Sequence, residues 1–299
     1  MTRRGWILFA AMGLIWGIPY LFIKIAVSEL TPASLVFLRT AIGAALLLPI
    51  AAARKDLGPL APHWRWIVAY TFVEVAAPWF LLSDAERRIS SSLSGLLIAL
   101  VPAIGAILAW ATGSDDRLDV RRVAGLGLGF FGVVALVGLD VNAGDVGAVG
   151  EVALVALGYA LGALIISRKL AILPLFGVVA SSLALTTVVY APVGIAQLPH
   201  TLPSPQIILA VSVLGVVCTA LAFLLFFPLV AEVGAARATV ITYVNPAVAL
   251  ALGVALLREP LTAGIVIGFV LIVAGSVLAT RRNTPARSSV ALSRSPDLL

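Results

Sequence analysis

The two halves of this chain carry the same succession of apolar runs and turns, and this duplication limits the fold more than any other feature. Pro102 and Pro246 each lie within an apolar run, 144 positions apart (246 − 102). In each half the run leads into a charged turn, at 115–118 and 258–261, and then into an apolar run that contains glycines. A duplicated membrane unit is typical of a transporter built from two repeats.

The composition indicates that most of the chain lies in a lipid bilayer. The sequence is 61% hydrophobic and 11% charged, whereas a soluble domain carries about 25% charged residues. The formal net charge of +6 does not indicate a nucleic-acid partner, because the basic residues form no stripe with interleaved aromatics. They fall in short loops and near the ends of apolar runs, as in proteins anchored in a membrane.

Ten apolar segments have the length of about 17–25 residues that a membrane-spanning helix needs. The sequence therefore predicts an all-α integral membrane protein with ten transmembrane helices in two five-helix repeats. Because five is an odd number, the second repeat is inverted in the membrane relative to the first. The predicted helices span residues 6–27, 33–53, 66–85, 91–110, 123–139, 149–166, 175–198, 207–230, 236–257 and 262–279.

The predicted domains are a first repeat at 6–139, a second repeat at 147–280 and a polar, disordered cytoplasmic tail at 281–299. Loop charge sets the orientation. With the N-terminus in the cytoplasm, 15 of the 20 Lys and Arg fall on inside segments, three on outside segments and two within helices. This excess predicts a multi-pass protein of a bacterial-type inner (plasma) membrane with both termini cytoplasmic.

An ordered set of residues near the start of the chain resembles a known family. Trp16-Gly17 with Lys24 eight positions on, and Pro32 followed by Arg39, resemble the opening of the EamA family in the drug/metabolite transporter superfamily.

The ends of the two halves extend this resemblance. The helices of Pro102 and Pro246, each followed by a charged turn and a glycine-bearing helix, are similar to the end of each EamA unit. The turn at 257–261 is close to the family's Gly-Glu-Arg/Pro-Leu turn, with Arg in place of Gly, and the first-half turn at 113–118 is looser. The resemblance covers residues 6–280. It implies a ten-helix inner-membrane carrier that exports amino acids or other small metabolites, of the YddG amino-acid exporter type.

Glu74, near the middle of the third predicted helix, is the main functional candidate. A charge at a helix centre costs about 2.5–3.5 kcal/mol on insertion scales and is functional by default. Pro78, four residues on, removes a backbone donor and predicts a kink. A carboxylate one turn from a kink suits a substrate amine or a coupling proton, and the alternative is a structural carboxylate hydrogen-bonded to a neighbouring helix. At the repeat offset Glu74 corresponds to Cys218, so the charge lies on one side only.

Trp16, Tyr20 and Lys24 share one face of the first predicted helix, because they are spaced by four residues. Trp16 and Tyr20 suit a cavity that sandwiches an apolar side chain, and Tyr159 is the equivalent of Trp16 in the second half. The alternative for these aromatic residues is a lipid-facing or interfacial position.

Lys24 and Arg39 are predicted near the outer ends of their helices. Lys24 can snorkel there, and either residue can pair with Asp84 or Glu86 or attract anions. A nucleotide-sugar carrier needs cationic groups deep in its cavity, and neither residue is predicted to lie at that depth.

In the ninth predicted helix Thr242, Tyr243 and Asn245 precede Pro246. Proline frees a carbonyl one turn earlier, and a freed carbonyl beside polar side chains predicts a binding site near the membrane midplane. The alternative is a packed kink in which Thr242 satisfies the backbone itself. Trp79 completes the predicted binding set, with packing as its alternative role. The predicted kinks are at Pro78, Pro102 and Pro246.

Several enzyme and cofactor motifs are excluded. The stretch 127–132 fits the dinucleotide fingerprint GxGxxG, but it lies inside a predicted spanning helix with no preceding strand, so helix packing is its expected role. Cys218 is the single cysteine, which excludes an internal disulfide and a cysteine zinc site. The sequence has no HExxH, GxSxG or Walker motif. We therefore expect no catalytic residues, cofactor or metal.

These features predict a secondary-active transporter that works as a monomer by alternating access. Its predicted substrate is an aromatic or neutral amino acid or a similar small molecule, with Glu74 as partner of an amine or a coupling proton. Drug efflux and sugar or nucleoside transport are alternatives among carriers. Rival classes are an enzyme acting on lipid head groups, which a lone Glu74 argues against, and a channel or scaffold, which scattered polar residues argue against.

Overall fold

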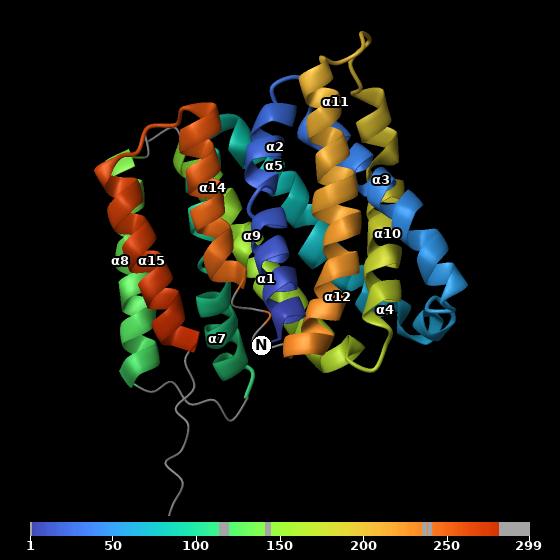
Figure 1. Cartoon of the computed structure of the whole chain (residues 1–299), viewed down its shortest axis with the longest axis horizontal. Coiled ribbons are helices and arrows are strands. Elements are labelled where there is room, and N and C mark those ends of the chain that lie inside the picture. Colours follow the sequence, from blue (N-terminus) through green and yellow to red (C-terminus); the bar gives the residue numbers. More distant parts are fainter. Residues whose placement is uncertain (1, 114–119, 141–144, 235–237, 239–240, 281–299) are drawn as a thin grey trace, which may run out of the picture.

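The computed structural model describes residues 2–113, 120–140, 145–234, 238 and 241–280, and helices form all of their regular secondary structure (Figure 1). The predicted tail at 281–299, the turn at 115–118 and the start of the ninth predicted helix at 236 lie outside the described residues. The helices lie side by side in one bundle, with the N-terminus at its lower end in Figure 1. We call this the N-terminal end and the opposite one the far end.

Several of the predicted membrane segments consist of two or more consecutive helical pieces. The pieces labelled η are a 3₁₀ helix (η1) and three π helices. In chain order the elements are α1 (Arg3–Ile15), α2 (Pro19–Ala26), α3 (Pro32–Ala53), η1 (Gly58–His63), α4 (Trp64–Tyr70), η2 (Thr71–Ala76), α5 (Ala77–Arg88), α6 (Ser91–Ile98), α7 (Val101–Ala111), α8 (Val120–Asp140), α9 (Val146–Ile165), η4 (Ile166–Leu170), α10 (Leu175–Ala196), α11 (Pro205–Ser212), η5 (Val213–Leu221), α12 (Ala222–Val233), α14 (Ile241–Leu257) and α15 (Ala263–Thr280).

The helices are those of a membrane protein. Large apolar side chains such as Phe72, Phe130 and Val188 remain more than half exposed on the bundle surface, where lipid can cover them. Each of the ten apolar segments predicted from the sequence falls on helix within the described part of the chain, and the shorter helices α14 and α15 are apolar as well. Seven described runs are long and apolar enough to cross a membrane, namely Arg3–Ala26, Pro32–Ala53, Gly58–Arg88, Ser91–Ala111, Val146–Leu170, Leu175–Ala196 and Pro205–Val233.

The first run is broken at 16–18, between α1 and α2. Pro19 begins α2, where its missing N–H removes the partner of a carbonyl four residues earlier. Gly17 lies in the break, and a Cβ at this position would collide with Val248 of α14. The close approach of α14 to the break therefore requires glycine.

The fourth run has a similar break at 99–100, between α6 and α7. Pro102 lies in the first turn of α7, where its missing N–H costs least. Ser276 of α15 donates a hydrogen bond from Oγ to the Ala99 carbonyl at 2.7 Å. A neighbouring helix thus satisfies a carbonyl at the break, as membrane helices require.

Two π-helical segments occupy equivalent places in the two halves. Adding the repeat offset of 144 to η2 gives 215–220, which lies within η5. Pro78 is the second residue of α5, which begins directly after η2. Glu74 lies on η2 and Cys218 on η5. The two π helices therefore carry the two residues that correspond to each other at the repeat offset of 144. Such π segments often lie at functional sites.

Equivalent helices of the two halves also pack against each other. Helices α8 and α15 form one pair at the left of the bundle in Figure 1, and α3 and α10 form another at the right. Glycines bring α8 and α15 together, because a Cβ on Gly275 would lie 2.5 Å from Gly129 N and 2.6 Å from Gly125 O. The GxGxxG stretch is thus part of a helix interface, as predicted.

Candidate functional site

A cavity of about 250 Å³ lies among helices of both halves. Its wall comes from the break between α1 and α2, and from α2, α3, η2, α5, α6, α7, α9, η5, α12 and α14. Eight of the predicted site residues line it, whereas Tyr243, Pro78 and Pro102 do not. The lining residues are Trp16, Pro19, Tyr20, Ile23, Arg39, Glu74, Trp79, Leu82, Ile98, Val101, Tyr159, Cys218, Phe223, Thr242, Asn245 and Pro246.

Glu74 reaches the cavity from η2. Its Oε2 atom is buried and has no hydrogen-bond partner among the described residues. Helix α9 leaves room for the carboxylate with a glycine, since a Cβ on Gly162 would collide with Glu74 Oε2. Gly158, one turn earlier, likewise lets α9 approach the backbone of η2, because a Cβ at this position would lie 2.5 Å from Val73 O. The described structure therefore does not supply the hydrogen bond from a neighbouring helix that a structural carboxylate needs.

Arg39 also lines the cavity, and the expectation that it lies near the outer surface is wrong. It lies seven residues into α3, about 10 Å along the helix axis, and is 8% exposed. Its guanidinium carbon lies 3.7 Å from the centroid of the Trp79 ring. Its Nε donates a hydrogen bond to Thr219 Oγ1 at 3.1 Å. The cavity therefore contains a cationic group as well as a carboxylate.

Lys24 has a structural role away from the cavity. Its Nζ donates to the carbonyls of Glu86 at 2.6 Å and Ile89 at 2.8 Å, at the C-terminal end of α5. A cation at this position complements the partial negative charge of a helix C-terminus. Both carboxylate oxygens of Glu86 are buried without a hydrogen-bond partner among the described residues. Asp84 pairs instead with Arg87 and Arg88.

The aromatic candidates of the first and third runs face inward. Trp16 packs against Phe223 and Phe226 of α12, with ring centroids 6.2 and 4.8 Å apart. Tyr20 is 6% exposed, and Trp79 lies under the Arg39 guanidinium. The lipid-facing alternative does not apply to Trp16 or Tyr20, because both line the cavity.

The ninth predicted helix divides its polar residues between two faces. Thr242, Asn245 and Pro246 line the cavity, whereas the Tyr243 hydroxyl donates to Ser276 O of α15 at 3.1 Å. With the side-chain amide of Asn245 oriented so that its nitrogen faces acceptors, this nitrogen donates to Ile241 O at 3.0 Å and to Gly13 O of α1 at 3.2 Å. Asn245 thus joins α14 to α1 at the cavity wall, and Tyr243 joins α14 to α15.

Sequence reasoning named Arg39 but did not place it in the cavity, and it missed Thr219. Thr219 orients the guanidinium, and Thr219 Oγ1 itself donates to Leu214 O at 2.8 Å, within η5. The available signal was an arginine inside an apolar run with no acidic residue within one turn of it. A buried arginine of this kind needs a partner from elsewhere in the fold.

The apolar helices are those of a membrane protein, and the cavity between its halves has room for a small molecule. The chain belongs to the EamA-like transporter family, whose model matches residues 3–138 and 148–281, one stretch in each half. The family resemblance predicted from the sequence is confirmed.

Relatives and a solved structure agree with this assignment over nearly the whole chain. The uncharacterized transporter YvbV of Bacillus subtilis (strain 168) is 24% identical over 96% of this chain and 95% of its own length. An uncharacterized transporter of Archaeoglobus fulgidus is 25% identical over 93% of this chain and 99% of its own. A solved protein crystal structure, 24% identical, shares the fold with a TM-score of 0.66, covering 94% of this chain and 97% of that one.

Proposed function

We propose that this protein is a secondary-active transporter that exports aromatic or neutral amino acids, or metabolites of similar size, by alternating access. One observation carries the proposal: a cavity walled by both halves holds the Glu74 carboxylate, whose Oε2 has no partner among the described residues. An amine of the substrate, or a coupling proton, is the partner that this carboxylate lacks. The proposed subtype is the YddG-type amino-acid exporter.

The proposed architecture is two inverted five-helix repeats, at 6–139 and 147–280, in a bacterial-type inner membrane with both termini cytoplasmic. Support comes from the family match in each half and from the two π segments at equivalent positions. The pairs α8 with α15 and α3 with α10 support it as well, since each joins equivalent members of the two repeats. One chain walls the cavity, so we propose that the monomer is functional.

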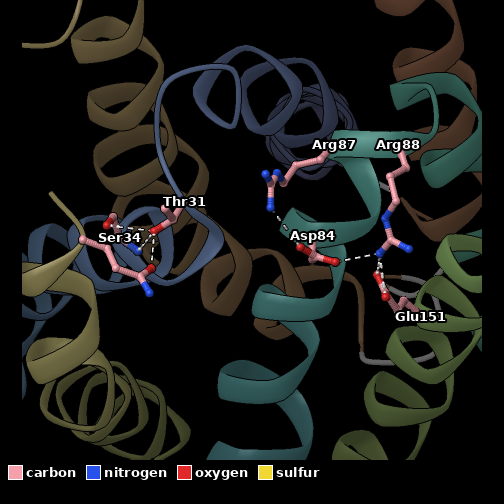
Figure 2. Close-up of polar contacts among 7 residues, drawn as sticks. Thr31, Ser34, Asp84, Arg87, Arg88 and Glu151 are labelled. Carbon is pink, nitrogen blue, oxygen red and sulfur yellow. Dashed lines mark hydrogen bonds and ion pairs between the residues drawn. The ribbon is translucent and has the colours of Figure 1, made fainter. Parts of the chain in front are cut away.

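Contacts between the halves at the far end support alternating access. Figure 2 shows Arg88 at the end of α5, paired with Asp84 and with Glu151 of α9 at 2.6 Å each. Thr31 Oγ1 donates to Gln197 Oε1 at 2.7 Å, and Ser34 Oγ donates to Gly194 O of α10 at 2.8 Å. We propose that the structure is closed at the far end. Export then requires these contacts to separate so that the cavity opens there.

Counterflow in proteoliposomes tests the proposal. Purified protein is reconstituted in vesicles preloaded with single unlabelled amino acids, and entry of labelled phenylalanine is followed. Accelerated, saturable entry with some preloads is the expected result, because a carrier exchanges bound substrate across the membrane. Absence of acceleration with amino acids, but acceleration with sugars, nucleosides or cationic drugs, would replace the substrate class. Linear, unsaturated entry regardless of preload would indicate a channel and overturn the carrier.

A further inference from the structure

We infer that Arg39 binds a carboxylate of the transported molecule, so that the cavity selects substrates carrying both an amine and a carboxylate. The inference rests on the proposed transport function and adds the charged groups of the substrate to it. Its basis is an arginine on the cavity wall whose terminal nitrogens have no partner among the described residues.

Arg39 offers more hydrogen-bond donors than its surroundings use. A guanidinium has five N–H groups, and only the Nε of Arg39 has an acceptor among the described residues, Thr219 Oγ1. Among the described residues, the ion pairs lie at the far end, around Arg88, and none of them includes Arg39. A desolvated cation without a counter-ion is costly. An anion from within the cavity supplies the missing partner.

The guanidinium is held in one orientation before any ligand arrives. Trp79 lies against its face, with the guanidinium carbon 3.7 Å from the ring centroid. Thr219 fixes one edge through Nε and is fixed in turn by its bond to Leu214 O. The edge that carries the two terminal nitrogens is left for a ligand. Two parallel N–H groups on a planar group match the two oxygens of a carboxylate.

The opposite charge lies on η2 of the first half, the segment equivalent to the η5 segment that anchors Arg39 from the second half. Glu74 lines the same cavity from η2, with its Oε2 unpartnered among the described residues, whereas Thr219 anchors Arg39 from η5. No described ion pair joins Glu74 to Arg39. The cavity therefore offers one cationic and one anionic group to a ligand. A molecule with one charge of each sign satisfies both.

Size and charge favour a carboxylate over a phosphate. The cavity of about 250 Å³ is smaller than the roughly 300–1,000 Å³ of pockets for drug-sized ligands, so it suits a molecule of amino-acid size. The rest of the wall includes Trp16, Leu82 and Phe223, which suit an apolar side chain. A phosphate monoester carries about two negative charges at pH 7, and a single arginine balances one.

The test compares four preloads in the counterflow assay with labelled phenylalanine. They are phenylalanine, phenylalaninamide (amine without carboxylate), hydrocinnamate (carboxylate without amine) and the phosphonate analogue of phenylalanine. We expect phenylalanine to stimulate entry best, and the three analogues to be weaker by roughly tenfold or more, the loss that removing a charged hydrogen-bond partner produces.

Variants then assign the carboxylate preference to Arg39. Arg39→Gln is expected to abolish the preference for phenylalanine over phenylalaninamide, so that the two preloads stimulate entry about equally. Arg39→Lys should keep part of this preference. The exposed Arg65→Gln, outside the cavity wall, is the matched control and keeps the full preference. Because Arg39→Gln can impair folding, ligand-induced shifts of the unfolding temperature in detergent give a second readout. Phenylalanine should raise this temperature in the unaltered protein and in Arg65→Gln, and should raise it more than the amide does.

The outcomes separate the two proposals. If phenylalaninamide exchanges as well as phenylalanine, or Arg39→Gln keeps the preference, the carboxylate assignment is wrong and the carrier stands. If the phosphonate exchanges faster than phenylalanine, the ligand of Arg39 is a phosphate-type anion instead. If no preload stimulates entry and no ligand shifts the unfolding temperature, the amino-acid carrier itself is overturned together with this inference.

Discussion

Glu259 binds the first residue of helix α6: its Oε1 accepts hydrogen bonds from both the backbone N–H and the hydroxyl of Ser91, at 2.8 and 2.9 Å. Its Oε2 accepts the same two kinds of bond from Ser92, at 3.0 and 2.5 Å. A carboxylate at a helix N-terminus meets unpaired N–H groups and the positive end of the helix dipole. The turn that ends α14 in the second half is thereby attached to the first half at the far end of the bundle.

Glu259→Gln should lower the free energy of unfolding by about 1–3 kcal/mol, because the amide replaces an oxygen that accepts two bonds with a donor. Thermal unfolding in detergent measures this loss. Glu151→Gln is the matched control, since its partly exposed pair with Arg88 is worth about 0–1 kcal/mol. Equal losses in the two variants would contradict the importance given to the Glu259 contact. Under the proposed alternating access, Glu259→Gln should also favour opening of the far end.

Glu74→Gln should reduce the counterflow rate by about 10- to 100-fold, because the cavity loses the charge proposed to bind an amine or a proton. Initial rates across a pH series are the measurement, with Glu74→Asp expected to retain part of the activity. Glu232→Gln controls for loss of a carboxylate at the N-terminal end, where Glu232 accepts a hydrogen bond from Thr2. An unchanged rate with an unchanged pH profile in Glu74→Gln would remove Glu74 from the site.

Gly162→Ala should destabilise the protein by about 1–3 kcal/mol and impair transport, because its Cβ would collide with the Glu74 carboxylate. Gly150→Ala, on the same helix, is the control. A Cβ there meets nothing within 4 Å, so the substitution should stabilise by up to about 1 kcal/mol through helix propensity. Unfolding temperature and counterflow rate are measured for both. Indistinguishable behaviour would mean that α9 does not approach η2 as closely as described.

Two glycines of the GxGxxG stretch should respond in opposite directions. A Cβ on Gly132 would lie 2.8 Å from Ile272 Cγ1 and 2.9 Å from Leu271 Cβ, whereas one on Gly127 meets nothing within 4 Å. Gly132→Ala should therefore cost about 1–3 kcal/mol of unfolding free energy, and Gly127→Ala should be neutral or stabilising. A phosphate-binding loop would instead require the first glycine. Loss of transport in Gly127→Ala but not in Gly132→Ala would support a phosphate-binding loop at 127–132 instead of a helix interface.

Glu29 links protonation to stability at the far end. Its Oε2 accepts a hydrogen bond at 3.0 Å from the backbone N–H of Ser204, which occupies the N-cap position of α11. Hydrogen bonds with Ser204 lower the pKa of the Glu29 carboxyl. Because the pKa of this carboxyl is lower in the folded protein, the ionised carboxylate stabilises the fold above the pKa of the unfolded chain, near 4.3. This stabilisation is lost as the pH falls through the pKa of the folded protein. Thermal unfolding between pH 7 and 3 should show a smaller acid-induced loss in Glu29→Gln than in the unaltered protein. Parallel curves would exclude this contribution.

The positions of the helices could be predicted from the sequence because the thickness of a bilayer fixes the length of an apolar run. The π segments could not, since a wide turn leaves the apolar pattern of the run unchanged. Glu74 was found because a carboxylate in an apolar run is conspicuous, whatever its neighbours are.

Depth and rotation of side chains were harder to predict. Arg39 was predicted at the outer surface because its distance from a helix end was judged without knowing how α3 packs among its neighbours. Thr242 and Tyr243 are adjacent in sequence, yet successive residues point about 100° apart around a helix. Only the packing of α15 against α14 decides that Tyr243 binds Ser276 while Thr242 lines the cavity.

The break at 16–18 divides the first membrane segment into two pieces that are attached to different helices, although α14 contacts both. Helix α1 is attached to α12 through Thr2 and Glu232, and to α14 through Gly13 and Asn245, whereas Lys24 attaches α2 to α5. Hinges in proteins are a few residues at element ends that absorb backbone rotation. Under the proposed alternating access, we expect the chain to bend at these three residues, so that α1 and α2 move with different partners and the rest of the segment keeps its helical geometry.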